Sequence, residues 1–128
     1  MKAHAIRIHK FGGPEVLKWE QVEVPDPVQD EVQIRHTAIG LNFIDTYHRT
    51  GLYPVHLPTG LGSEASGIVE AVGPSVTDIA VGDRVVYTGG PVDSYSELRN
   101  FPAALLAPIP ESMSNEHAAA VFLKGLTA

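Results

Sequence analysis

The sequence predicts a mainly β domain with short helices, arranged as a barrel or a sandwich. Three observations point to this fold class. Short strand-like stretches recur along the chain, glycine and proline clusters that favour turns separate them, and there is no internal repeat. At 128 residues, the chain fits one domain or one piece of a larger protein.

The first third of the chain predicts three strands. Ala3–Lys10 alternates in part and ends at Phe11–Pro14, a sequence typical of a turn. A second strand is expected over Val16–Val24, and Pro25–Pro27 ends it because proline lacks the backbone donor of a sheet. Glu31–Ile39 alternates clearly, which indicates a half-buried strand.

A short helix is predicted over Asn42–Arg49. Asn42 suits the N-cap, and Asp45 suits the N3 position of a capping box. Gly51 suits the C-terminal end, where the backbone turns left-handed. The prolines and glycines of Leu52–Gly62 then predict a loop.

The second half of the chain predicts further short strands and then a helix. Ser114 is expected to cap this helix, and Glu116 favours the positive end of its dipole. The apolar helix is followed by only a few residues without a capping signal, so we expect a longer protein to continue here. The expected strands are Ala65–Val72, Val85–Tyr87 and Tyr95–Arg99, and Leu105–Pro110 is expected to be extended.

Composition excludes several classes of function. The net charge is −6, which argues against nucleic acid or an anionic membrane as the main partner. There are no cysteines, so disulfides and thiolate metal sites are excluded, and a reducing compartment fits. The sequence shows no secretory signal and no apolar run of membrane-spanning length. We therefore expect a soluble, cytoplasmic protein.

Common catalytic motifs do not match. The six histidines form no helical i, i+4 pair and no HExxH motif, so a histidine zinc site is not expected. Gly62–Gly67 has the wrong spacing for a nucleophile elbow. Gly60–Gly62 lacks the third glycine of a dinucleotide fingerprint, and there is no P-loop.

The polar side chains that remain as candidates cluster in residues 38–67. Asp45 and Glu64 suit an acid and base pair, or alternatively a helix cap and a buried hydrogen-bonding anchor. Tyr47 and Tyr53 suit phenolic donors to a substrate oxygen, or alternatively partly buried aromatic packing. The residue types alone leave both pairs of alternatives open.

Five stretches together resemble a known family. The chain is similar, over almost its whole length, to the N-terminal part of the zinc-free, NADPH-dependent quinone oxidoreductases. These are ζ-crystallin-like members of the medium-chain dehydrogenase/reductase superfamily. The stretches are HKFGGPEVL at 9–17, AIGLNFIDTYHRTGLYP at 38–54, GLGSEASGIVEAVG at 60–73, GDRVVY at 82–87 and AAAVFLKGLTA at 118–128.

Differences from the zinc-dependent members sharpen the resemblance. Asn42 stands where those enzymes have a metal-binding cysteine, and Ser63 stands where they have a histidine ligand. The resemblance therefore implies no catalytic zinc. An electron-poor acceptor such as a quinone needs less Lewis-acid help than an alcohol.

The resemblance implies a GroES-like, distorted β-barrel over residues 1–128, truncated before a Rossmann domain that binds most of the NADPH. It implies direct hydride transfer to a quinone, inactivity of the isolated domain, and a homodimer for the full-length protein. The implied catalytic residues are Asn42, Tyr47 and Tyr53. The implied cofactor-binding residues are Asn42, Phe43, Ile44, Asp45, Tyr47, Lys124 and Thr127.

Three other functions remain open at this point. An enone or alkenal reductase would use the same site with a different acceptor. Relatives of the same fold also have RNA-binding or structural roles. The negative net charge of this chain argues against RNA as its main ligand. A GroES-like co-chaperonin is the third alternative, and the dehydrogenase-like residues 60–73 argue against it.

Overall fold

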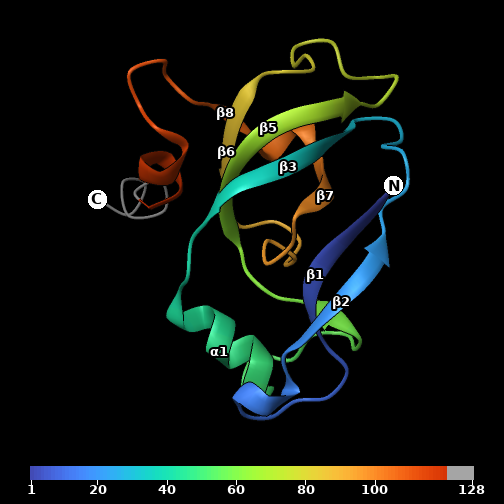
Figure 1. Cartoon of the computed structure of the whole chain (residues 1–128), viewed down its shortest axis with the longest axis vertical. Coiled ribbons are helices and arrows are strands. Elements are labelled where there is room, and N and C mark those ends of the chain that lie inside the picture. Colours follow the sequence, from blue (N-terminus) through green and yellow to red (C-terminus); the bar gives the residue numbers. More distant parts are fainter. Residues whose placement is uncertain (121–128) are drawn as a thin grey trace.

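The computed structural model describes residues 1–120, whose strands form two antiparallel sheets (Figure 1). The smaller sheet has the strand order β2-β1-β4, and the larger has the order β7-β3-β5-β6-β8. The smaller sheet contains β1 (Lys2–Ile8), β2 (Lys18–Glu23) and β4 (Thr59–Gly60). The larger contains β3 (Glu31–Ile39), β5 (Glu64–Val72), β6 (Arg84–Thr88), β7 (Leu98–Pro102) and β8 (Ala107–Pro108).

Helical segments are few and short. The helix α1 (Phe43–Thr50) follows β3 and lies at one end of the molecule, beyond the sheets (Figure 1). Two 3₁₀ turns, η1 (Pro14–Val16) and η2 (Ala103–Leu105), connect strands. A further helix begins at residue 115 and runs to the end of the described residues.

The main core lies on one face of the five-stranded sheet. Tyr87 and Phe101 are fully buried there, with ring centroids 4.1 Å apart. Arg99 lies over the Phe101 ring at 4.9 Å from its centroid, a cation–π contact inside the core. The aliphatic members of this core are Val32, Ile34, Ala65, Val69 and Val85.

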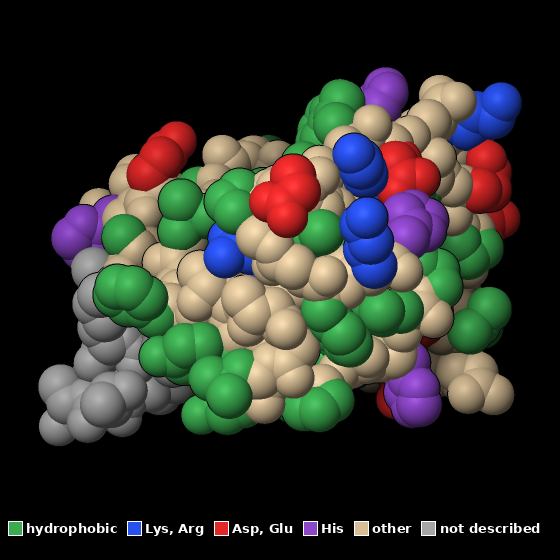
Figure 2. Space-filling model, turned by 90° about the horizontal axis from the view of Figure 1, so that it is seen from below, with side chains coloured by type: hydrophobic (Ala, Val, Ile, Leu, Met, Phe, Trp, Pro, Cys, Tyr) green, Lys and Arg blue, Asp and Glu red, His purple; other side chains and the backbone are tan. Residues whose placement is uncertain are grey.

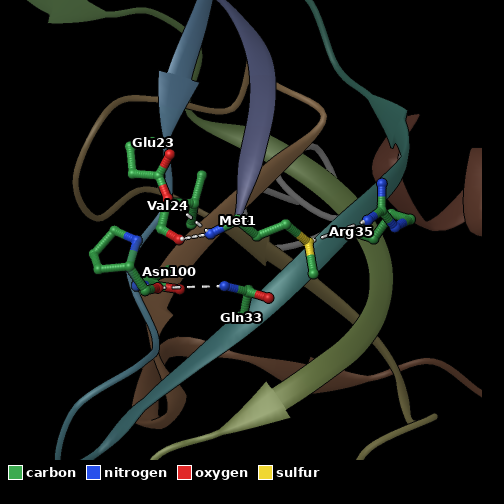
Figure 3. Close-up of polar contacts among 7 residues, drawn as sticks. Met1, Glu23, Val24, Gln33, Arg35 and Asn100 are labelled. Carbon is green, nitrogen blue, oxygen red and sulfur yellow. Dashed lines mark hydrogen bonds and ion pairs between the residues drawn. The ribbon is translucent and has the colours of Figure 1, made fainter.

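Polar contacts join the end of β2 to the larger sheet (Figure 3). The Pro25 carbonyl accepts hydrogen bonds from Gln33 Nε2 at 3.3 Å and from Asn100 Nδ2 at 2.9 Å. A bridge between Ala5 and Ser96 is a second link. The described strands therefore form two connected antiparallel sheets, a mainly β arrangement with short helices as the sequence predicted.

The structure changes three of the predicted elements. Val16 belongs to η1, because Pro14 starts a 3₁₀ turn that buries Val16 beside Ile8. Thr59–Gly60 pairs with β1 within a segment predicted to be loop. Strand β7 begins at Leu98, not at Tyr95, because the backbone of Tyr95 instead bonds to Ile6 and Leu61.

Candidate active site

The start of α1 positions the polar residues of the site. Asn42 is the N-cap, with the extended backbone that this position requires. The Asp45 carboxylate accepts a 3.1 Å hydrogen bond from the Asn42 backbone N–H, which is the return half of a capping box. Gly51 ends the helix with a φ of 87°, a left-handed conformation that favours glycine. These local signals confirm the predicted helix.

The Asn42 side chain is held by Glu64. Asn42 Nδ2 donates a 2.7 Å hydrogen bond to Glu64 Oε2, and Glu64 is only 1% exposed. Gly40 allows this contact, since a Cβ there would lie 2.6 Å from the same oxygen. A charge-assisted bond to a buried carboxylate is stronger than a neutral one. Glu64 therefore fixes the orientation of the Asn42 amide.

The Asp45 carboxylate accepts a second hydrogen bond, from Tyr95. The Tyr95 hydroxyl donates a short hydrogen bond to Asp45 Oδ2, the oxygen that also accepts from Asn42. Burial raises the pKa of Tyr95 well above its usual value, and the hydrogen bond and negative charge of Asp45 raise it further. Tyr95 therefore stays protonated and keeps donating. The geometry of Asp45 is that of a helix cap, and the geometry of Glu64 is that of a buried hydrogen-bonding anchor for Asn42.

Tyr47 and Tyr53 come together at the C-terminal end of α1. Their rings meet edge to face with centroids 5.2 Å apart, and the ring centroid of His48 lies 6.4 Å from that of Tyr53. The Tyr53 backbone N–H donates to the Tyr47 carbonyl at 3.2 Å. Both side chains are at least partly exposed, at 37% for Tyr47 and 49% for Tyr53. The pair can present phenol hydroxyls to a ligand while each ring supports the other.

Two hollows adjoin Asn42. The first, called the α1 hollow, measures about 430 Å³, and its lining includes Asn42, Phe43 and Asp45. The second, called the Glu64 hollow, measures about 420 Å³ and lies between Gly40 and the helix that begins at residue 115. Figure 2 views the molecule from the α1 end and shows hydrophobic side chains gathered on this face.

The predicted site residues do not all lie together. Asn42, Phe43 and Asp45 line the α1 hollow, whereas Tyr47 and Tyr53 form their own cluster. Ile44 lies within α1 and is partly exposed. Lys124 and Thr127 lie outside the described residues. Sequence reasoning missed Tyr95, because no local pattern links it to Asp45, fifty residues away.

A family model of the alcohol dehydrogenase GroES-like domain matches residues 28–111, well over half of the chain. The chain belongs to this family. The predicted GroES-like fold is therefore confirmed.

Relatives of this GroES-like domain are longer than it is. It is 52% identical over 126 residues to a quinone oxidoreductase of Pseudomonas aeruginosa, covering 98% of this chain and 39% of that relative. It is 45% identical over 127 residues to a 2-haloacrylate reductase of a Burkholderia species, covering 94% of this chain and 38% of that relative. The chain thus spans about two fifths of the length of the curated relatives it matches.

The crystal structure of Escherichia coli quinone oxidoreductase complexed with NADPH matches the GroES-like domain with a TM-score of 0.95. The two are 52% identical, and the match covers 98% of this chain and 39% of that one. The structure of a 2-haloacrylate reductase matches with a TM-score of 0.88 at 44% identity, covering 97% of this chain and 37% of that one. The strand arrangement is therefore that of the N-terminal part of these reductases.

Over residues 1–120, no three histidine, aspartate or glutamate side chains gather in a metal-binding arrangement. In the same residues, no helix is long and apolar enough to cross a membrane. Asn42 uses its amide as a hydrogen-bond donor to a carboxylate, which is a different chemistry from that of a thiolate ligand.

Proposed function

We propose that this GroES-like domain is the acceptor-binding part of a longer, NADPH-dependent reductase that transfers a hydride to a quinone. The observation that carries this proposal is the 0.95 TM-score match, at 52% identity, to a quinone oxidoreductase complexed with NADPH. The proposed site contains a fixed amide and exposed apolar side chains, and two tyrosines lie further along α1 and just after it. Those groups suit a flat, uncharged acceptor.

The residues near Asn42 fit the nicotinamide end of NADPH. Leu41 is 78% exposed and Phe43 is 83% exposed, so two apolar side chains flank the amide and offer a surface for a planar ring. When bound, NADPH supplies the hydride. Asn42 and Phe43 would hold the ring, while Ile44, Asp45 and Tyr47 support them from α1. Most of the cofactor would bind to a domain outside this chain.

The role of these residues is positioning. Asn42 has a second amide hydrogen available to bind an acceptor oxygen, because Glu64 takes only one. The hydroxyls of Tyr47 and Tyr53 are further donors toward such an oxygen. Hydride transfer needs the two rings close and aligned, which a pre-oriented amide favours. We propose that the reaction proceeds without zinc, in a cytoplasmic protein that forms a homodimer at full length.

Kinetics of site variants test this proposal in the longer protein. Asn42→Ala and Tyr53→Ala should lower kcat/KM for 1,4-benzoquinone by about 10-fold or more, since each removes a positioning donor. Val81→Ala is the matched control, because Val81 is exposed and lines neither hollow. Unchanged kinetics in both site variants would remove these residues from the site.

One observation favours a second candidate, an enone or alkenal reductase. A 2-haloacrylate reductase of a Burkholderia species is 45% identical to this chain. Its name describes reduction of a haloacrylate, a compound with an activated carbon–carbon double bond that a hydride from NADPH would also reduce. A panel that compares 1,4-benzoquinone with 2-chloroacrylate and a simple alkenal, under one set of conditions, separates the two candidates by kcat/KM.

A further inference from the structure

A third hollow lies beyond Leu41, on the side facing β1 and β2. This cavity, called the Trp19 hollow, measures about 530 Å³. Trp19 is 59% exposed, and its ring stacks on His4 with centroids 5.2 Å apart and planes 11° apart. An exposed tryptophan ring that is stacked on a neighbouring ring offers its other face to an apolar group. The apolar lining residues are Ile6, Trp19, Ile39, Leu41 and Tyr95.

The Trp19 hollow and the α1 hollow share a wall. Leu41 and Tyr95 line both hollows, and Leu41 also lines the Glu64 hollow. Leu41 directly precedes Asn42 in the chain, so the shared wall adjoins the fixed amide. A ligand held at Asn42 thus has an apolar recess directly past Leu41.

The charged groups at the Trp19 hollow already have partners. Arg35 Nε donates to Glu70 Oε1 at 2.6 Å. Glu97 Oε1 accepts from the His4 backbone N–H at 2.7 Å and lies 3.4 Å from His4 Nδ1. These contacts leave the aromatic and aliphatic surfaces as the main feature open to a ligand. A neutral apolar group suits such a lining, whereas a charged group would compete with existing pairs.

We propose that the Trp19 hollow is a subsite for a neutral, apolar substituent carried by the acceptor, such as the alkyl chain of a substituted quinone. This inference rests on the proposed function. The reacting ring lies beside Asn42, and its substituent passes Leu41 and Tyr95 to pack on Trp19. The domain therefore favours alkyl-substituted acceptors over unsubstituted ones of the same redox chemistry.

A kinetic comparison in the longer protein tests the subsite. The acceptors are 2-decyl-1,4-benzoquinone and 1,4-benzoquinone, and the variants are Trp19→Ala and the exposed control Val28→Ala. Trp19→Ala should raise KM for the decyl quinone about 10-fold and leave KM for benzoquinone unchanged. Val28→Ala should change neither. Equal effects of Trp19→Ala on both acceptors, or no effect on either, would overturn the subsite.

A binding measurement separates this inference from the proposed reaction. Trp19 is the only tryptophan of this chain, and the emission difference between wild type and Trp19→Phe isolates its signal within the longer protein. 1-Nonanol should shift Trp19 emission to shorter wavelength at concentrations where 1-butanol does not. A shift without quinone reduction supports the subsite and rejects the reaction. No shift, in a protein that reduces benzoquinone, rejects the subsite alone.

Discussion

The side-chain amide of Asn42, which lies in the turn that joins β3 to α1, donates a 2.7 Å hydrogen bond to Glu64 Oε2. This bond links the helix cap to the first residue of β5. Because the carboxylate is buried, the bond both stabilises the fold and orients the amide.

Asn42→Ala leaves the buried Glu64 carboxylate without its side-chain donor. We expect the free energy of unfolding to fall by about 1–3 kcal/mol, the usual cost of an unsatisfied buried partner. Urea unfolding of the variant measures this change. Thr50→Ala is the control, because its hydroxyl makes an exposed 3.4 Å contact with the Tyr47 carbonyl in the same helix. A control that loses as much stability as Asn42→Ala contradicts the expectation.

Gly40→Ala should disturb the same pair, because the new Cβ would lie 2.6 Å from Glu64 Oε2. We expect clear destabilisation in urea unfolding, of about 1–3 kcal/mol for overpacking. The double variant with Glu64→Ala decides the cause. If the side chain of Glu64 is the obstacle, Gly40→Ala costs much less in the Glu64→Ala background. Equal costs in both backgrounds would point to backbone strain instead.

Tyr95→Phe removes the hydroxyl that donates to Asp45. The expected loss is about 1.5–3 kcal/mol, because the bond is made to a charged group in a partly buried place. Asp45→Asn in combination should give less than the sum of the two single losses, since both changes break the same bond. Strictly additive losses in urea unfolding would show that the bond contributes little.

His36 should make stability depend on pH. Its Nδ1–H donates to the Ser96 carbonyl at 2.7 Å, and its Nε2 accepts from the Tyr87 hydroxyl at 2.9 Å, so the ring is neutral. Burial lowers the pKa of His36 from 6.5 to about 4, the hydrogen bond to Ser96 opposes this shift, and the Arg99 charge adds to it.

The depressed pKa sets the direction of the effect. The unfolded chain takes up the proton first, so the contribution of His36 is fully present above about pH 6.5 and is lost as pH falls toward 4. The total loss is about 3 kcal/mol. Urea unfolding between pH 7 and pH 4 measures it, with His36→Gln as the reference that removes this titration. Parallel pH profiles for the two proteins contradict the assignment.

Local sequence signals predicted part of this structure well. The bounds of β3 and the caps of α1 follow from alternation over Glu31–Ile39 and from Asn42 and Gly51, which act within a few residues. The Glu31–Gly51 region was therefore predictable as strand, cap and helix. Strand β4 was missed and the bounds of β7 were misplaced, because pairing with strands far away in the sequence decides both.

The contacts that build the candidate site were harder to predict. The Asn42–Glu64 bond spans 22 residues, and the Tyr95–Asp45 bond spans 50. Side-chain pairing at such separations depends on how the sheets pack, which alternation does not encode. The sequence indicated that Asn42, Asp45 and Glu64 lie in one region, but it did not show which side chains touch. It did not point to Tyr95 at all.

We propose that this domain serves an NADPH-dependent reductase that needs a further domain. The most direct test measures NADPH oxidation with 1,4-benzoquinone, side by side, for this chain and for a form extended to the length of its relatives. We predict quinone-dependent oxidation by the extended form and none by this chain alone. A folded extended form that binds NADPH but reduces no quinone would contradict the claim.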